Sequence, residues 1–387
     1  MQAAFICSEE LWSRGFGKSH PLRPERLKRT YDLLTAYHAF DALTSHLVEP
    51  RPATREELLL FHTVEYVDAG QRLSAALSLP NGAAPSLPGE RNEDWTLAGR
   101  YGFSSDETPA FAGMFETEGL KAGAALVGAE MVAQGQAQVA FSIAGGMHHA
   151  RPALASGFCV FNDVALAIHW LLRQGFRVAY VDIDVHHGDG VQAAFYDTDQ
   201  VLTISLHQAG IMFYPGTGFP EELGEGPGYG YSINVPFLPY TDEDLYLWAF
   251  RQVVPSLVRQ FAPDVLVTQL GVDTHYRDLL GSLLLTTQGY VALVEEFKTL
   301  AEGAGRWLAF GGGGYAIDVV PRAWVLAYGV MSAQSFPDEL PPAYAERYGS
   351  GRLHDVDGPE PVEAWTAKQT RAYVEKGLAV LKNEAWV

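Results

Sequence analysis

The residues with the clearest capacity for chemistry lie between Val181 and Gly190, which read Val-Asp-Ile-Asp-Val-His-His-Gly-Asp-Gly. Side chains alternate along a β-strand, so Asp182, Asp184 and His186 would project from one face. Carboxylates and imidazoles at this spacing are typical metal ligands, and Asp184 and His186 are the strongest candidates. Asp273 follows a later apolar run and is the expected third ligand, from a neighbouring strand.

This ligand set predicts a catalytic metal rather than a structural one. One histidine and two carboxylates leave a fourth coordination position open for water, as in catalytic zinc sites. The same oxygen-rich set also suits Fe(II), so zinc and iron are both candidates. The competing interpretation is that these residues are strand-end polar groups that satisfy loop amides, but the neighbouring motifs favour a metal site.

Two adjacent histidines, His148 and His149, follow another apolar run in Ala-Gly-Gly-Met-His-His-Ala. Beside a metal-activated water, such a pair supplies a proton acceptor and a proton donor. Each ring needs a carboxylate on its far nitrogen to set its tautomer and charge, and Asp182 and Asp189 are the unassigned acids nearby. A tandem histidine in isolation is more often a surface or packing feature, so this interpretation depends on the adjacent metal ligands.

A run of four glycines precedes Tyr315 at the end of another apolar segment. The run has neither the Gly-x-Gly-x-x-Gly spacing nor the following Lys-Ser/Thr of phosphate-binding loops. A flexible backbone that presents one phenol fits better, because a tyrosine hydroxyl donates a hydrogen bond to a developing oxyanion. Phe158 and Tyr214 lie in two further loops, where they are either core side chains or the two walls of a narrow apolar slot.

The segments that carry these residues follow apolar runs with the composition of β-strands. The runs recur at 139–143, 178–185, 201–206, 231–237, 265–270 and 307–310, and helical patterns at 118–134, 164–173, 243–261 and 288–302 separate several of them. This alternation predicts an α/β fold in which helices cover both faces of a parallel sheet, with its chemistry at the carboxyl ends of the strands. The Pro- and Gly-rich stretches 74–93 and 205–230 are predicted to be long loops that build the site.

The chain is predicted to form a single catalytic domain over residues 1–335. Residues 336–387 begin with a Pro- and Gly-rich segment and end with a helical pattern that carries an apolar stripe. We expect this C-terminal part to pack on the same domain, and an oligomer is possible because the helix would also suit a second subunit.

The composition excludes several function classes. The 387 residues include 27 basic and 46 acidic side chains, a formal charge of −19, so nucleic-acid phosphates are not expected partners and a cationic substrate is favoured. Cys7 and Cys159 are the only cysteines, which argues against a disulfide framework and against a cysteine zinc site. The sequence has neither a signal-peptide pattern nor an apolar run long enough for a membrane span, so a cytoplasmic location is expected.

Six segments together resemble the zinc-dependent histone deacetylase superfamily, in particular its class I-like and bacterial acetoin-utilization branch. The segments occur in the family's order and are 144–150, 157–163, 181–190, 213–218, 270–273 and 311–315. The resemblance implies an arginase/deacetylase-like fold: a three-layer αβα domain with an eight-stranded, mainly parallel sheet. It also implies that metal-activated water removes acetyl groups from the acetyl-lysine side chains of proteins.

The resemblance implies a role for each matching catalytic residue. Zinc would be held by Asp184, His186 and Asp273. His149 would act as general base and then general acid, with His148 as its electrostatic partner, and Tyr315 would polarise the acetyl carbonyl. Asp182 would orient His148, and Asp189 would orient His149.

The resemblance also implies substrate and ion contacts. Residues that would surround the acetyl-lysine side chain and its backbone are Gly157, Phe158, Tyr214, Leu280 and the rim acid Glu107, for which Asp106 is the alternative. Arg26 would line an internal channel through which acetate leaves. A structural potassium ion would lie near Asp182, Asp184, His186, Ser205 and Leu206.

Departures from the family pattern bear on the substrate. Tyr214 replaces a phenylalanine, which adds a hydroxyl at the mouth of the slot and favours a more polar substrate. Leu280 falls where polyamine-specific relatives carry an acid, which weakens an acetylpolyamine substrate without excluding it or another small cationic amide. A dinuclear arginase-like site is poorly supplied, because Gly188 and His275 stand where further carboxylates are needed. A non-catalytic binding module is disfavoured because His149 and Tyr315 are both present.

Overall fold

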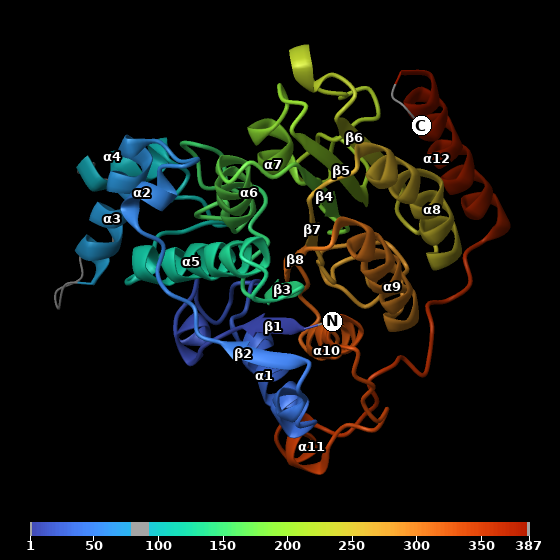
Figure 1. The fold of residues 1–387 in the computed structure, drawn as a ribbon, viewed down its shortest axis with the longest axis horizontal. Helices are drawn as coiled ribbons and strands as arrows, with labels where there is room; N and C mark the ends of the chain where they lie inside the picture. Colours follow the sequence, from blue (N-terminus) through green and yellow to red (C-terminus); the bar gives the residue numbers. More distant parts are fainter. Residues whose placement is uncertain (1, 79–92, 385–387) are drawn as a thin grey trace.

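The computed structural model describes residues 2–78 and 93–384. Within them, eight strands form one sheet in the order β2-β1-β3-β8-β7-β4-β5-β6, and every neighbouring pair is parallel (Figure 1). The strands are β1 (Ala3–Ile6), β2 (Ser45–Val48), β3 (Val139–Ser142), β4 (Val178–Asp182), β5 (Val201–Gln208), β6 (Ser232–Phe237), β7 (Val265–Gln269) and β8 (Trp307–Phe310). The predicted parallel sheet is therefore confirmed, and β1 and β2 extend it at one edge.

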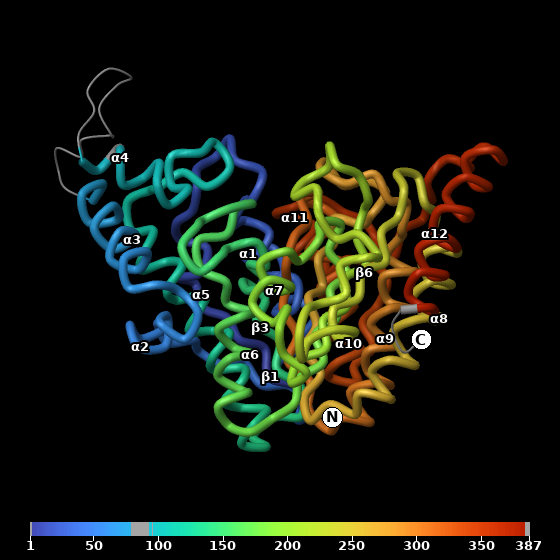
Figure 2. The backbone as a smooth tube through the Cα atoms, turned by 90° about the horizontal axis from the view of Figure 1, so that it is seen from above, coloured from blue at the N-terminus to red at the C-terminus, as the bar shows by residue number. Residues whose placement is uncertain are grey.

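Helices cover both faces of the sheet, as predicted, and so form a three-layer αβα domain (Figure 2). One face packs against α1 (Glu25–Ala36), α8 (Glu243–Phe261), α9 (Thr287–Ala304) and α10 (Val320–Ser332). The other face packs against α5 (Met114–Ala133), α6 (Asp163–Arg173) and α7 (Asp189–Ala194). The remaining helices are α2 (Arg55–Leu58), α3 (Val64–Leu77), α4 (Glu93–Arg100), α11 (Pro342–Tyr348) and α12 (Ala364–Glu384). No helix in the described ranges is long and apolar enough to cross a membrane.

Alternating side chains bind the two helical layers to the sheet. Phe5 and Phe141 contribute to the core on one face, whereas their neighbours Ile6 and Ala140 contribute to the core on the other. A strand buried on both faces therefore needs apolar residues at every position, which is the pattern of the continuous apolar runs in the sequence.

Strand β4 ends earlier than predicted, at Asp182 rather than at Val185. The cause is local: Asp182 Oδ1 accepts a hydrogen bond from the amide of Asp184 (3.0 Å), and Asp184 Oδ1 accepts one from the amide of His186 (3.0 Å). Such side-chain bonds to nearby amides favour turns over extended backbone. The predicted strand alternation therefore does not place these side chains; a turn stabilised by the same carboxylates does.

The two predicted long loops also differ from the structure. Strand β5 continues to Gln208, so the second loop starts after residue 208. Helix α3 extends through 74–77, and residues 79–92 of the first predicted loop lie outside the described part of the chain.

The four central strands end where the candidate residues begin. β3, β8, β7 and β4 are neighbours in the sheet, and their carboxyl ends lead to 143–150, 311–315, 270–273 and 183–190 respectively. Because all strands are parallel, these four segments meet at one edge of the sheet, where open α/β sheets carry their sites.

The C-terminal segment lies against this domain. In α12, Val374, Leu378 and Leu381 are buried within the core that covers one face of the sheet, and the helix contacts the edge strand β6. The guanidinium of Arg371 lies 4.6 Å from the ring centroid of Trp248 in α8. The segment before α12 is attached through Asp355.

Asp355 forms the main polar link between this segment and the domain. Its Oδ2 lies 2.7 Å from His275 Nε2 and accepts a hydrogen bond from the amide of Thr287 (2.8 Å), while Oδ1 accepts one from Arg322 Nη2 (2.9 Å). Burial acts to raise the pKa of Asp355, but the bond to His275 and the other partners outweigh it and lower the pKa.

We expect Asp355→Asn to lower the free energy of unfolding at neutral pH by roughly 1–3 kcal/mol, because the guanidinium of Arg322 loses its carboxylate partner and His275 and Thr287 lose a charged acceptor. A carboxyl whose pKa is lowered by folding stabilises the protein above its unfolded pKa, near 3.9, and loses that contribution as the pH falls towards the folded pKa. Urea unfolding of both proteins from pH 7 to pH 3 should show a difference that is full at neutral pH and shrinks below about pH 4. A difference that grows on acidification would contradict this assignment.

Candidate active site

The three predicted metal ligands converge. Asp184, His186 and Asp273 are buried, and one potential ligand atom from each lies within 4.8 Å of the others. His186 Nδ1 is 3.0 Å from Asp184 Oδ1 and 3.3 Å from Asp273 Oδ2. The turn after β4 and the segment after β7 thus bring two carboxylates and one imidazole to a single point.

Surrounding groups orient these ligands. Asp184 Oδ2 accepts hydrogen bonds from Gln269 Nε2 (2.6 Å) and from the amide of Gly313 (2.8 Å). Asp273 Oδ1 accepts one from the amide of Val185 (2.9 Å). A Cβ atom on Gly313 would lie 2.0 Å from Asp273 Oδ2, so the glycine run must pass this point without side chains.

The donors fit a divalent cation. Asp273 Oδ2 is a buried oxygen that accepts no hydrogen bond, although polar atoms in protein interiors nearly always have a partner. Burial, and then the charge of Asp184, raise the pKa of Asp273. A cation bound by the two carboxylates would give this oxygen a partner and would offset the repulsion between the two charges. Oxygen and imidazole donors suit zinc or Fe(II).

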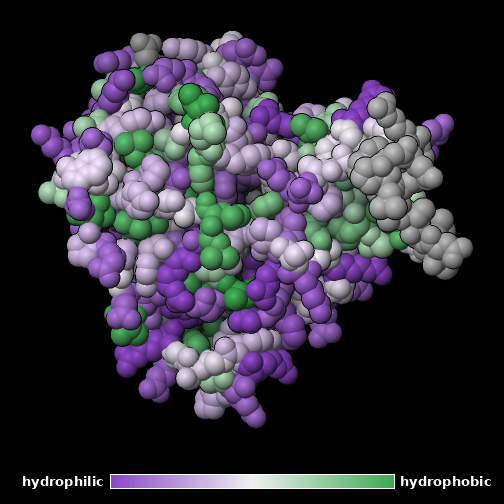
Figure 3. Space-filling model, turned by 180° about the vertical axis from the view of Figure 1, so that it is seen from behind, coloured by the Kyte–Doolittle hydropathy of each residue, from purple (hydrophilic) through white to green (hydrophobic). Residues whose placement is uncertain are grey.

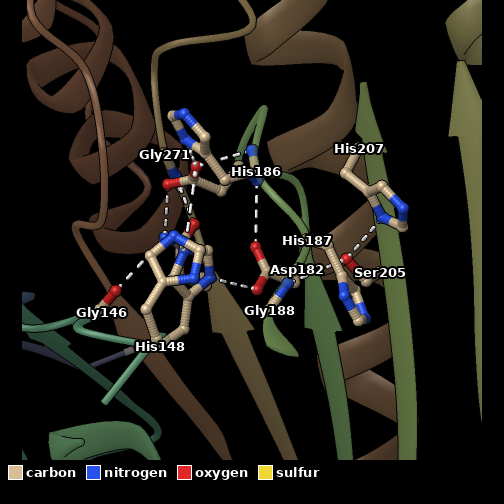
Figure 4. Close-up of polar contacts among 12 residues, drawn as sticks. Gly146, His148, Asp182, His186, His187, Gly188, Ser205, His207 and Gly271 are labelled. Atoms are coloured by element: carbon tan, nitrogen blue, oxygen red, sulfur yellow. Dashed lines mark hydrogen bonds and ion pairs between the residues drawn. The ribbon is translucent and has the colours of Figure 1, made fainter. Parts of the chain in front are cut away.

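The histidine pair lies beside this point, and each ring has the predicted carboxylate. His148 Nδ1 is 2.7 Å from Asp182 Oδ2, and His149 Nδ1 is 2.7 Å from Asp189 Oδ1. The two Nε2 atoms are 3.0 Å apart. Figure 4 shows His148 facing Asp182 close to His186. Arg151 Nη2 also donates to Asp189 Oδ2 (2.7 Å).

The surroundings give the two rings different charges. Burial acts to lower the pKa of His148, but the charges of Asp182 and Asp184 outweigh it and raise the pKa to about 9. For His149, burial and then the neighbouring His148 lower the pKa to about 3. At neutral pH, His148 is therefore protonated and His149 is neutral, so His149 is the ring able to accept a proton.

Aromatic side chains form the walls above the metal ligands. The Tyr214 ring lies 4.9 Å from the His149 ring, and the Phe158 ring lies 5.8 Å from the Tyr315 ring. Between these walls, Gly157 has φ 53°, and a Cβ there would be 2.4 Å from His149 Cδ2. Only glycine fits this close approach.

The cavity between these walls has a volume of about 20 Å³, enough for roughly one water molecule. Its lining comprises Leu22, Gly146, Met147, His148, His149, Gly157, Phe158, Cys159, Asp184, His186, Gly312, Gly313 and Tyr315. Seven of the predicted site residues thus line one narrow space, namely His148, His149, Gly157, Phe158, Asp184, His186 and Tyr315.

The Tyr214 hydroxyl has a partner within the protein. It is 2.5 Å from Ser156 Oγ, so its hydrogen bond joins the two loops that form the slot. A tyrosine hydroxyl with one such bond keeps further hydrogen-bonding capacity. The preference for a more polar substrate stays a prediction.

The outer edge of the site is largely apolar. Ile211, Met212 and Leu279 are exposed, and they lie in the loops that carry Tyr214 and Leu280. Figure 3 shows a band of hydrophobic side chains down the middle of the face opposite to that of Figure 1. Leu280 itself packs near Tyr315 and Phe158.

The predicted rim acid, Glu107, lies in the loop before Thr108. Glu107 is exposed, and its carbonyl accepts a hydrogen bond from His20 Nε2 (3.0 Å). The neighbouring Thr108 Oγ1 accepts one from the amide of Phe158 (3.1 Å). This loop is therefore attached to the aromatic wall. Asp106, the neighbour of Glu107, is also exposed.

Arg26 is buried behind the glycine run. Its Nη1 donates to the carbonyls of Gly312 (2.7 Å) and Gly314 (3.2 Å), and its guanidinium lies 5.1 Å from the ring centroid of Trp324. Arg26 also lines a small cavity of about 10 Å³ that shares Leu22 with the main one.

Of the residues predicted to surround potassium, Asp182 lies in β4, Ser205 and Leu206 lie in β5, and Asp184 and His186 lie in the turn after β4. Asp182 in β4 pairs in register with Ser205 in β5. Ser205 Oγ is 2.9 Å from His207 Nδ1, and the Leu206 carbonyl accepts a hydrogen bond from Tyr246 (3.1 Å).

Sequence reasoning missed two residues that hold the site together. Gln269 ends β7 and donates to the predicted metal ligand Asp184. Asp278 accepts a hydrogen bond from the amide of Tyr315 (2.7 Å). A glutamine at the end of a buried apolar strand is a usable signal, whereas nothing local in the sequence identifies Asp278.

Comparisons with known proteins place the chain in a family. The sequence model of the histone deacetylase domain matches residues 20–331. The acetoin utilization protein AcuC of Bacillus subtilis is 40% identical over 350 residues, which cover 89% of this chain and 86% of that protein. Histone deacetylase B of Dictyostelium discoideum is 35% identical over 340 residues, 88% of this chain and 76% of that protein.

Solved structures extend the likeness to the whole fold. The crystal structure of a histone deacetylase (HDAC) homologue from Aquifex aeolicus superposes with a TM-score of 0.82 at 31% identity, covering 97% of this chain and all of that one. An HDAC homologue complexed with SAHA gives a TM-score of 0.83 at 32% identity over the same shares. On sequence and fold together, the chain belongs to the histone deacetylase family.

Proposed function

We propose that this protein is a cytoplasmic zinc-dependent amidohydrolase that removes acetyl groups from the acetyl-lysine side chains of proteins. The observation that carries the proposal is the buried cluster of Asp184, His186 and Asp273 at the base of a narrow aromatic slot, beside a neutral histidine and a tyrosine. Acetylated polyamines and other small cationic amides are the alternative substrates.

Asp184, His186 and Asp273 would hold the zinc ion. When bound there, zinc supplies a Lewis acid that lowers the pKa of water and polarises an acetyl carbonyl. A potassium ion near the carbonyls of β4 and β5, involving Asp182 and Ser205 among others, would have a structural role. Support for the zinc site comes from the unpartnered oxygen of Asp273 and from the family membership.

The protein's own groups would move the protons. His149, neutral and oriented by Asp189, would take a proton from the attacking water as the new C–O bond forms. Tyr315 would donate a hydrogen bond to the carbonyl oxygen as negative charge develops on it. The protonated His149 would then give its proton to the amine nitrogen as the C–N bond breaks, leaving acetate and free lysine. His148, held charged by Asp182, would favour the negative transition state.

The slot would bind an alkyl chain that ends in an acetamide. Phe158 and Tyr214 would flank the methylenes, Gly157 would leave room between them, and Leu280 would close the side near Tyr315. Glu107 would bind the substrate backbone at the rim. Arg26 would line the exit for acetate behind the glycine run. A protein substrate suits the apolar edge of the slot better than a small polycation does.

Asp184→Ala should abolish metal binding, because it removes one of three ligands and leaves Asp273 as the remaining carboxylate. Elemental analysis of the purified proteins should find about one zinc or iron per wild-type chain and much less in the variant. Asp242→Ala, at the first turn of α8 and away from the cluster, is a control that should keep the metal. Equal metal content in Asp184→Ala and wild type would reject this ligand.

His149→Ala and Tyr315→Phe should each lower kcat on an acetyl-lysine peptide by about 100-fold or more, because each removes a group that acts in the transition state. Neither residue is in the ligand set, so both variants should keep the metal content of the wild type. Steady-state kinetics together with metal analysis checks both statements. Wild-type turnover in either variant would reject its catalytic role.

The substrate class is tested by comparing kcat/KM for an acetyl-lysine peptide, N-acetylputrescine and N8-acetylspermidine, with His149→Ala as the blank. We expect the peptide to be preferred by about 10-fold or more, since the edge of the slot is apolar near Leu279 and Leu280. Preference for either polyamine would favour an acetylpolyamine deacetylase and would mean that an acid such as Glu107 binds the distal ammonium group.

A further inference from the structure

Asp278 lies in the turn between Asp273 and Leu280, and its carboxylate accepts three backbone hydrogen bonds. Oδ2 accepts from the amides of Tyr315 (2.7 Å) and Ala316 (3.2 Å), and Oδ1 accepts from the amide of Leu280 (2.9 Å). One side chain therefore links the segment that follows the third metal ligand to the segment that carries the tyrosine. Bonds from N–H groups to a carboxylate are stronger than bonds to a neutral acceptor.

The backbone before Tyr315 needs such an anchor. Gly312 and Gly314 have φ values of 91° and 123°, and glycine has little intrinsic preference that would hold this conformation. On the inner side, Arg26 binds the carbonyls of both glycines. On the outer side, Asp278 binds the amide of Tyr315 itself. The turn is thus held from both sides, and Asp278 is attached at the residue that bears the phenol.

The turn that carries Asp278 is itself held in place. The amide of Asp278 donates to the carbonyl of His275 (2.9 Å), and His275 Nε2 is 2.7 Å from the buried Asp355. A second link between the same two segments is the ion pair of Arg277 Nη2 with Asp318 (2.7 Å), in which both side chains are about half exposed. Exposed pairs contribute little, so the carboxylate of Asp278 is the stronger of the two links.

We propose that Asp278 is a positioning residue that sets the place of the Tyr315 hydroxyl relative to the metal ligands, and that it does so together with Leu280 on the slot wall. This inference rests on the proposed function, in which Tyr315 donates to the developing oxyanion. Misplacement of a catalytic group by about 1 Å can cost about 100-fold in rate. Asp278 does not line the cavity, so the proposed effect on the reaction passes through the backbone of Tyr315, which its carboxylate binds directly.

The test is a double-mutant cycle on the metal-loaded full-length protein with an acetyl-lysine peptide. Asp278→Asn keeps the shape but turns one acceptor into a donor that faces backbone amides. It should lower kcat by about 10-fold or more and change KM by less than about 3-fold. In the Tyr315→Phe background, the same change should alter kcat by less than about 2-fold, because the group it positions is gone. Arg277→Gln, which breaks the neighbouring ion pair, is the matched control and should leave kcat within about 2-fold of wild type.

Two kinetic outcomes would overturn the inference: an Asp278→Asn enzyme as active as the Arg277→Gln control, or an equal loss of kcat in the wild-type and Tyr315→Phe backgrounds. If the wild type hydrolyses no acetyl amide, the proposed function fails and hydrogen exchange decides the positioning role. Amides of residues 312–317 should then exchange faster in Asp278→Asn than in wild type and Arg277→Gln. Unchanged exchange would overturn the inference.

Discussion

Two carboxylates buried side by side are the constraint on which this site depends. Asp184 and Asp273 lie at the carboxyl edge of the sheet, where removal from water costs each charge several kcal/mol and the two repel each other. His186 and donors from the backbone and Gln269 offset part of this cost, but one oxygen of Asp273 has no hydrogen-bond partner. A cation bound at this point would complete the balance. The adjoining glycine run follows from the same constraint, because any side chain at Gly313 would occupy the space between the carboxylates.

The same buried charges place two adjacent histidines, His148 and His149, in different electrostatic surroundings. His148 faces two carboxylates and is held protonated, whereas His149 shares a single carboxylate with Arg151 and lies against the charged His148. The pKa values of the pair are therefore pushed in opposite directions. Groups whose pKa values are separated in this way are the usual means by which one site holds an acid and a base at neutral pH.

Much of this arrangement could be predicted from the sequence, because the chemistry lies in short segments directly after long apolar runs. Six of the eight strands, β3 to β8, and the convergence of Asp184, His186 and Asp273 follow from that pattern. Strands β1 and β2, on one side of the sheet, do not, and β2 is partly polar. Tertiary contacts decide the rest. The Tyr214 hydroxyl is bound by Ser156, and Asp278 reaches Tyr315 across 37 positions of sequence. No local pattern encodes either contact.

The account as a whole depends on a metal ion acting together with groups of the protein at one site. The measurement that tests this most directly is a titration of chelator-treated protein with zinc, followed by hydrolysis of an acetyl-lysine peptide and by metal content. Turnover that is absent without metal and rises in proportion to zinc until about one ion is bound per chain is the predicted result. Turnover that persists in metal-free protein, or a saturated site that hydrolyses no acetylated amide, would contradict the account.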